Sequence, residues 1–571
     1  MKKLFVFMFV ICTCFGFAQT KPSYLQLKDQ PIHTIREYGV KGDGTNEYNK
    51  VKSAIEAGGV LIVPADMTIT VDSPAVSTSG MTVAKSLILT GGGTFKQSAT
   101  PASTPFAVLH IIASGGMTIA VDGINFDANN KAANGLCVQL PVASTGGIAS
   151  VRNCSAVKAQ DLSAAQSSIG IWVYGMWDTV NIENNSISNI VRGTAPSSVA
   201  LAGGISVSES LGNVTISGNK IDGVISNAGI GWVDADGISV FTRNHLTTAD
   251  PLHSVVIRDN FVKNCSGRWV KLQTPGAKVI SNTFRNDTVT TMTNFTGVDV
   301  QAGRCDIIGN TIIVTGGVTV GSSSAFVNMQ GIVNSKRVLR CNDNTFHFTH
   351  ATSDWPYGVI VTAPAAYDTA ETVYDIVGNV LMGDIITTVY CSETATSTRT
   401  FPVVTKVDSN VLSESTDSRN LLALEGAQFG GAVAGDKYTW IVTNNSIRTP
   451  STTFNGGRPF LATNGADRCG WLKLANNSGW ANGARYSAPA LYLILPGSDF
   501  WFDGDASHAF SSEIGSAGVV LGYQQLHIKR GENGITTFRG NASSSTALKY
   551  VNAWAPITVP SASWTYSVAY P

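Results

Sequence analysis

Two aspartates separated by one residue lie near a group of basic side chains in this sequence. Asp234 and Asp236 come just before the alternating stretch GISVF (237–241), and Arg268 and Lys271 follow in GRWVKLQ. Most glycoside hydrolases use one carboxyl to protonate the leaving oxygen and a second carboxylate to activate water. The pattern therefore indicates acid–base chemistry on a glycosidic bond. Because Asp-Gly is also a common turn signal, a purely structural role for both aspartates is the alternative.

Seven short alternating stretches, from GIWVY (170–174) to GVIVT (358–362), supply a surface for such chemistry. If they are strands stacked in register, their polar residues point outward and the apolar residues between them point inward. The first outward column then contains Trp172, Ser206, Ser239, Lys271, Asp299, Asn328 and Ile360. The second contains Tyr174, Ser208, Phe241, Gln273, Gln301, Gln330 and Thr362.

This face suits a sugar chain, because aromatic rings and hydrogen-bonding amides lie along it. Its predicted substrate-binding residues are Trp172, Tyr174, Gln273 and Gln301. The longest insertion of the repeat lies beside it, and such insertions commonly build the site of a solenoid. That insertion adds three further candidates, Trp232, Arg243 and His245. The alternative is an ordinary solvated face with a Lys271–Asp299 surface ion pair.

A short unit recurs along the chain and would position these stretches. It consists of an apolar residue, two further residues, Asn, one residue and a second apolar residue, as in IENNSI (182–187). Asn tolerates the left-handed conformation of a sharp bend, and stacked Asn side chains can form a hydrogen-bonded ladder. The unit therefore predicts stacked coils that bend at Asn185, Asn219, Asn260, Asn282, Asn310, Asn344, Asn379, Asn410, Asn445 and Asn477.

The composition agrees with a turn-rich β-solenoid, since 57 of the 571 residues are Gly and only 14% are charged. Lys+Arg and Asp+Glu number 39 each, so no overall charge favours nucleic acid or a membrane as a partner. The cysteines form no CxxC pair. A zinc site is therefore not indicated, and we interpret most of them as small buried residues.

The N-terminus has the pattern of a secretory signal, with Lys2 and Lys3 before a short apolar run. The segment 35–66 then contains a Gly-Asp-Gly turn and apolar residues at helical spacing, at Tyr48, Val51, Ala54 and Ile55. This segment and the coil periodicity resemble the pectate-lyase-like superfamily, which includes β-helical lyases, polygalacturonases and tailspikes. The resemblance implies an all-β, right-handed, single-stranded parallel β-helix with an N-terminal capping helix.

The expected organisation has four parts. A signal peptide at 1–19, which implies secretion, precedes an N-terminal segment with the capping helix at 20–60. The parallel β-helix occupies 61–480, and further coils or a β-rich cap occupy 481–571.

The motif Asp236-Gly237-Ile238 is similar to the Asn-Thr-Asp-Gly motif of polygalacturonases, in which the Asp is catalytic. The chain departs from that family in the next two coils. Gly267-Arg268 stands where an Asp-Asp pair belongs, and 295–297 stands where Gly-His-Gly belongs. This argues against a polygalacturonase. The pair Asp234 and Asp236 looks more like the carboxylates of β-helical carrageenases, which implies catalytic roles for both.

Three functions follow as hypotheses. The first is a cofactor-free glycoside hydrolase of an acidic polysaccharide, sulfated or uronic-acid-containing, in which Asp236 works with Asp234 or Asp299. The second is a polysaccharide lyase with Lys271 as base and Arg268 as neutraliser, to which Ca²⁺ could contribute. The third is a non-catalytic adhesin. A polysaccharide is the expected partner in each, and the oligomeric state stays open.

Overall fold

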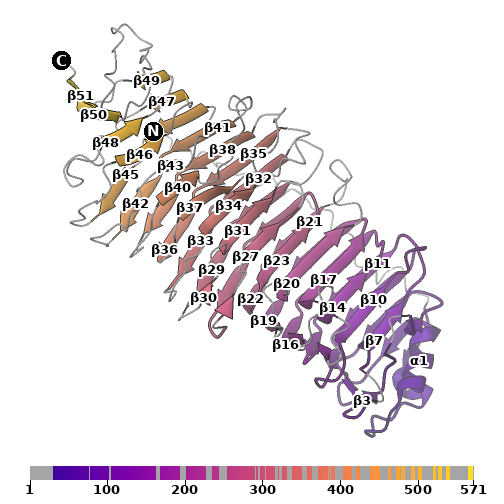
Figure 1. The fold of residues 1–571 in the computed structure, drawn as a ribbon. Helices are drawn as coiled ribbons and strands as arrows, with labels where there is room; N and C mark the ends of the chain where they lie inside the picture. Colours follow the sequence, from indigo (N-terminus) through magenta and orange to yellow (C-terminus); the bar gives the residue numbers. More distant parts are fainter. Residues whose placement is uncertain are drawn as a thin grey trace, which may run out of the picture.

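The computed structural model describes residues 30–449 with gaps, and after residue 449 only the backbone of the strands. The gaps lie at 76–77, 102–103, 162–166, 193–200, 227–234, 243–253, 290, 293–295, 302–303, 316–318, 321–323, 331–336, 350–356, 363–370, 384, 386, 393–402, 414–419 and 425–437. Within these limits the chain is a parallel β-helix, as predicted (Figure 1). No helix in the described part is long and apolar enough to cross a membrane.

A typical coil contributes one strand to each of three sheets, which we name A, B and C. Sheet A has 17 strands, from β1 (Ile32–Thr34) to β49 (Gln525–Lys529). Sheet B has 15 strands, from β3 (Thr68–Val71) to β45 (Ser478–Ala481). Sheet C runs from β4 (Met81–Thr82) to β51 (Trp564–Ala569), which pairs antiparallel with β50 (Ile535–Gly540). Each coil thus pairs with the backbone of the next.

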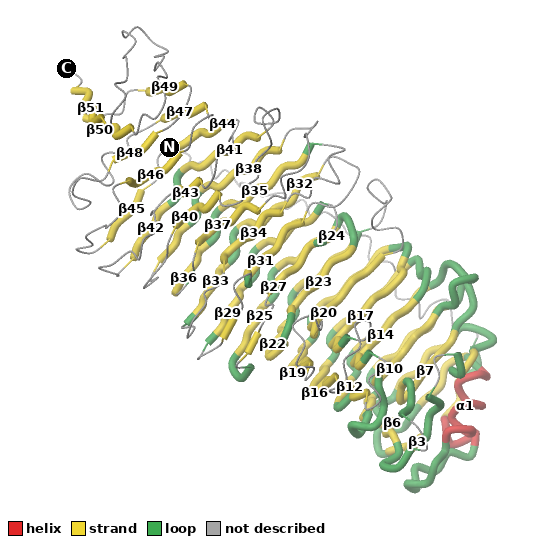
Figure 2. Tube along the Cα trace, viewed as in Figure 1, coloured by secondary structure: helices red, strands yellow, loops and turns green. Residues whose placement is uncertain are grey.

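Sheet C carries the predicted outward columns, and Figure 2 shows its strands lying side by side. Inward residues such as Val173, Val207, Val240 and Leu272 are buried in one continuous core. Its strands in this region are β7 (Ala107–Ile112), β10 (Asn134–Gln139), β14 (Ser168–Tyr174), β17 (Ala202–Ser210), β20 (Ala235–Thr242), β23 (Arg268–Gln273), β27 (Thr296–Val300), β31 (Ala325–Gln330) and β34 (Tyr357–Thr362).

The corner between sheets A and B is formed by the Asn units. At one such corner, Asn282 separates β24 (Ala277–Ile280) from β25 (Thr283–Asn286). Its Nδ2 and its backbone N–H both donate to Oδ1 of Asn310, each at 2.9 Å. The same pair of bonds repeats from Asn185 to Asn445, and all nine of these side chains are buried. The predicted ladder is confirmed over this range, whereas Asn477 lies outside the described residues.

The expectation that the ladder Asn itself adopts the left-handed conformation is wrong. The residue before it does so instead, with φ of 57° at Asp259, 54° at Ser281 and 64° at Gly309. One left-handed residue is enough for the bend. The Asn that follows can then direct its amide at the neighbouring coils, where it also donates to backbone carbonyls such as that of Val279.

Glycine recurs at the start of the sheet C stretches for a steric reason. A Cβ on Gly237 would lie 2.4 Å from Cγ1 of Val262 and 2.8 Å from the backbone oxygen of Trp269. Val262 belongs to the core, as does Ile238, so two successive positions face inward. This interruption of the alternation leaves Asp236 on the outer face of sheet C.

The N-terminal segment folds as its spacing predicts. Helix α1 (Tyr48–Ala57) follows the short 3-10 helix η2 (Ile35–Tyr38) and buries Val51, Ala54 and Ile55 in the main core. Figure 1 shows α1 at one end of the solenoid. Just before it, the buried carboxylate of Glu47 accepts from the backbone N–H groups of Lys41 at 2.7 Å and Gly42 at 2.8 Å. These bonds fix the turn that leads into the helix.

The cysteines whose side chains the structure describes are free and buried, as the sequence predicted: Cys137, Cys154, Cys265, Cys305 and Cys341. Burial raises the pKa of the Cys154 thiol to about 12. A thiol that stays protonated is a poor nucleophile and a poor metal ligand. These residues therefore act as small apolar side chains.

Candidate functional site

Strand pairing confirms the first outward column. Trp172 pairs with Ser206, Ser206 with Ser239, and Ser239 with Lys271. Lys271 pairs in turn with Asp299, and the column continues through Asn328 to Ile360. The second column is paired from Tyr174 through Ser208 and Phe241 to Gln273, and again at Gln330 and Thr362. The strands therefore place the candidate residues on one face, about 4.8 Å apart per coil.

The connections between strands differ in length, and the longer ones adjoin strands of sheet C in the sequence. Between sheets A and B the connection is as short as Ser281-Asn282. The longer ones directly precede or follow strands of sheet C, as at 193–200, 227–234, 243–253, 331–336 and 363–370. Insertions restricted to the edges of one sheet are typical of a solenoid whose site lies on that sheet.

A charged cluster occupies the middle of the face. Nη1 of Arg268 lies 3.4 Å from Oδ1 of Asp236, and Nε of Arg268 lies 2.9 Å from Oδ2 of Asp299. The three residues come from β20, β23 and β27, which are successive strands of sheet C. The structure thus brings together three of the five predicted catalytic residues around one guanidinium group, with Lys271 in register beside Asp299.

Asp299 is held by further donors. Gln301 Nε2 donates to its Oδ2 at 2.7 Å, and Asn328 Nδ2 donates to its Oδ1 at 3.1 Å. Gln273 in turn donates to Gln301 Oε1 at 2.9 Å. Two side-chain amides therefore donate hydrogen bonds to this carboxyl group, and Arg268 forms an ion pair with it.

The cluster is buried although it lies outside the core. Asp236 is 0% exposed and Asp299 is 2% exposed, while the Arg268 side chain is 19% exposed. Lys271, Gln273 and Gln301 keep partial exposure. Burying charges costs several kcal/mol per ion, and pairing offsets that cost only in part. A cluster of this kind is therefore a candidate functional site.

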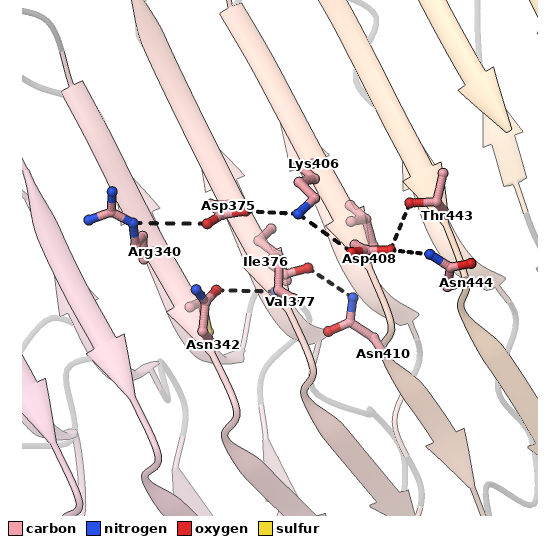
Figure 3. A network of polar contacts seen from close by, with 12 residues as sticks. Arg340, Asn342, Asp375, Ile376, Val377, Lys406, Asp408, Asn410, Thr443 and Asn444 are labelled. Carbon is pink, nitrogen blue, oxygen red and sulfur yellow. Dashed lines mark hydrogen bonds and ion pairs between the residues drawn. The ribbon is translucent and has the colours of Figure 1, made fainter. Parts of the chain in front are cut away.

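Charged residues on sheet A provide a contrast. Arg340 lies 2.9 Å from Asp306 and 3.9 Å from Asp375, and Lys406 bridges Asp375 and Asp408 at 3.9 and 3.4 Å (Figure 3). Opposite charges alternate from coil to coil, and the Arg340 and Lys406 side chains are about 40% exposed. Exposed pairs of this kind contribute little energy. We therefore interpret this row as an ordinary solvated face.

Toward the N-terminal end of the sheet C face, the described outward columns contain serine and aromatic side chains. Ser239 donates to Ser206 at 3.1 Å, and Trp172 Nε1 donates to Ser208 Oγ at 3.3 Å. The Trp172 and Tyr174 rings are in edge contact, with centroids 5.9 Å apart. The predicted aromatic end and the charged centre thus share one face.

Four predicted site residues, Asp234, Trp232, Arg243 and His245, lie outside the described residues. Within the described part, no group of three or more His, Cys, Asp or Glu residues could hold a metal ion. Sequence reasoning placed Asn328 in the column but gave it no role, and it did not include Phe106, His110 or Gln139. The stretches AVLHII and NGLCVQ could have revealed the last two, because they align with GIWVY as earlier strands of the same sheet.

No family model matches the chain, and no curated protein matches it. Several solved structures resemble it. The mannuronan C-5 epimerase AlgE4 A-module of Azotobacter vinelandii is 11% identical, with 76% of this chain and 98% of that chain covered and a TM-score of 0.37. The N-terminal fragment of bacteriophage Phi29 gene product 12 is 12% identical, with 91% and 93% covered and a TM-score of 0.43. The tailspike of E. coli bacteriophage HK620, in complex with a pentasaccharide, is 12% identical, with 94% and 92% covered and a TM-score of 0.39. We base no functional argument on similarities at this level.

Proposed function

We propose that the outer face of sheet C binds an acidic polysaccharide and hydrolyses it, with Asp236 and Asp299 as the carboxyl pair. The observation that supports this most directly is the pair of buried carboxylates on either side of Arg268. Because both contact one guanidinium group, their contacted oxygens lie within about 9 Å of each other. This upper limit is compatible with the roughly 6.5–9.5 Å of inverting hydrolases and with the roughly 5–5.5 Å of retaining hydrolases.

We assign different roles to the two carboxyls from their contacts. Asp299 accepts hydrogen bonds from Gln301 and Asn328 and pairs with Arg268, so we assign it to activate water as the base. Asp236 is assigned as the acid that protonates the leaving oxygen. Lys271 would bind a sulfate or carboxylate of the substrate. Because Asp236 is fully buried, the proposal includes a rearrangement on binding that exposes it.

Binding without catalysis is the second candidate. It is favoured by the near-complete burial of both carboxylates in contacts with Arg268. A lyase would need Arg268 to neutralise a substrate carboxylate. That role would compete with the two aspartates that the guanidinium already contacts.

The test is incubation with a panel of uronic-acid and sulfated polysaccharides, with reducing ends and ultraviolet absorbance of unsaturated uronates followed together. Hydrolysis gives reducing ends without absorbance. A lyase gives both, and a binding protein gives neither while still retaining the polymer. Asp299→Asn and Asp236→Asn should each lower kcat by roughly 10²–10⁴. Asp306→Asn, which removes a surface carboxylate of sheet A, serves as the matched control. Unchanged kcat in Asp236→Asn would rule out the assigned acid.

A further inference from the structure

A second side-chain cluster lies on the outer face of sheet C, near its N-terminal end. Phe106, Ala107 and Cys137 are buried against one another, and Trp172 packs on them, separate from the main core. Cys137 pairs in register with Trp172 in the first outward column, whereas the neighbouring Val138 points into the core. The cluster therefore lies on the outside of the solenoid wall.

Four rings form a connected group in this cluster. The Phe106 centroid lies 5.0 Å from that of His110 and 5.8 Å from that of Trp172. Tyr174 meets Trp172 edge-on, at an interplanar angle of 74°. We name Phe106, His110, Trp172 and Tyr174 the aromatic platform. Because Trp172 also donates to Ser208, its ring is held by a hydrogen bond as well as by packing.

The platform combines apolar rings with an amide. Gln139 Oε1 lies 2.8 Å from Nε2 of His110, and Gln139 pairs in register with Tyr174. Gln139, Trp172 and Tyr174 are each partly exposed, so a ligand can reach them. Flat apolar surfaces beside a few polar groups suit a sugar ring, whose C–H groups can lie on aromatic faces while its hydroxyls bond to amides.

The platform and the charged cluster are aligned along the solenoid axis. Trp172 and Asp299 lie in the same outward column, four coil steps apart through Ser206, Ser239 and Lys271. At about 4.8 Å per coil the separation is roughly 19 Å. One extended chain lying along the column can therefore contact both ends. Of the two serines between them, Ser239 is partly exposed and Ser206 is buried.

We infer that the aromatic platform is a second binding site, which holds sugar units of the same polysaccharide about 19 Å from the charged cluster. The inference rests on the proposed function for the identity of the polymer, but not for its cleavage. It adds the partly exposed Gln139 to the binding face, and it gives the buried Phe106 and His110 the role of supporting the Trp172 ring. It also makes the site one for a long chain, since a short oligosaccharide could not reach both ends.

The test is affinity electrophoresis of the full chain in gels that contain alginate, polygalacturonate or κ-carrageenan. Trp172→Ala should raise the dissociation constant for the polymer that retards the wild type by roughly tenfold. Trp172→Phe should restore most of the retardation. Phe261→Ala is the matched control, because it removes an aromatic ring that is 37% exposed on sheet B. Tyr174→Ala provides a second variant if Trp172→Ala unfolds, with thermal unfolding as the check.

The possible outcomes distinguish a failure of the proposed second binding site from a failure of the proposed hydrolysis. Weaker binding in Trp172→Ala, with no cleavage by the wild type, would support the platform and overturn hydrolysis. Equal retardation of folded Trp172→Ala, folded Tyr174→Ala and wild type would overturn the platform, whether or not the wild type cleaves the polymer. Retardation of the wild type by none of the three polymers would also count against it.

Discussion

The corner between sheets A and B and the edges of sheet C are built in opposite ways. At the A–B corner the chain turns within Ser281-Asn282, and the same two bonds, from the side-chain amide and the backbone N–H of one Asn to Oδ1 of the next, recur coil after coil. At the edges of sheet C the connections vary from coil to coil, and the outward residues change from Trp172 to Lys271 and Asp299. The A–B corner therefore has the same structure in successive coils, whereas the outer face of sheet C carries different side chains in each coil.

We infer from this difference that the A–B corner mainly contributes stability and that the outer face of sheet C mainly contributes function. A ladder of buried amides leaves each coil little freedom, because every donor must meet an acceptor in the next coil. Sheet C has no such constraint on its outer face, since its backbone bonds are made within the sheet. Side chains there can vary without breaking the solenoid. Mutations at the corner should therefore affect unfolding, and mutations on sheet C should mainly affect ligand binding and turnover.

The largest expected loss of stability is at the corner. Asn310→Ala removes the acceptor of two bonds from Asn282 and the donor to Asn344 and Val279. Because the buried groups left behind each cost about 1–3 kcal/mol, the free energy of unfolding should fall by about 4 kcal/mol. Urea unfolding followed by circular dichroism measures this. The neighbouring Thr311→Ala, on the outer side of sheet B, should change it by less than about 0.5 kcal/mol. Similar losses in the free energy of unfolding for the two variants would show that the Asn ladder contributes no more to stability than a residue on the outer side of sheet B.

A somewhat smaller loss is expected in the charged cluster. Arg268→Met removes the cation from two buried carboxylates and should lower the free energy of unfolding by about 3 kcal/mol. Unlike Asn310→Ala, it should also weaken polymer binding at temperatures where the variant stays folded. Arg340→Met, which breaks exposed pairs on sheet A, should cost at most about 1 kcal/mol. Equal stability losses in the two arginine variants would show that burial of the cluster has no energetic consequence.

His110 should make the sheet C face sensitive to acid. Burial lowers the pKa of its imidazole, although the hydrogen bond with Gln139 acts in the opposite direction. As the pH falls below about 6.5, the unfolded chain binds a proton before the folded chain does, so stability decreases. The decrease levels off below the folded pKa. Comparing Tm at pH 7.5 and 5.5 for the wild type and His110→Gln isolates this contribution. An identical pH dependence in both proteins would contradict the prediction.

The smallest effect is expected beside the corner, at Asp408. Burial raises the pKa of this carboxyl, but hydrogen bonds from Thr443 and Asn444 and the charge of Lys406 outweigh it, so the pKa lies below its ordinary value of 3.8. Its contribution is complete above that value and is lost as the pH falls through the folded pKa. Asp408→Asn should cost only about 0.5 kcal/mol at pH 7, and acid titration of Tm should show the wild type losing this advantage. A loss in the free energy of unfolding as large as that of Asn310→Ala would contradict the expectation that the buried ladder contributes more to stability than the surface residues beside it.

The architecture of a coil could be predicted from the residues alone. The spacing of the Asn units predicted a ladder that holds from Asn185 to Asn445. The period of two in stretches such as GIWVY and GVDVQ predicted both outward columns. These features are predictable because each coil packs against its neighbours in the same way, so the same residue types recur at the same positions.

The contacts between side chains on the sheet C face could not be predicted in this way. Arg268 was predicted as a substrate-binding or neutralising cation, yet it lies between Asp236 and Asp299. The left-handed residue precedes the Asn, and Phe106 and His110 join Trp172 from earlier coils. The physical reason is that these contacts join residues one or two coils apart through connections of unequal length. Periodicity determines the face to which a side chain belongs, whereas rotamer and burial on that face depend on everything packed around it.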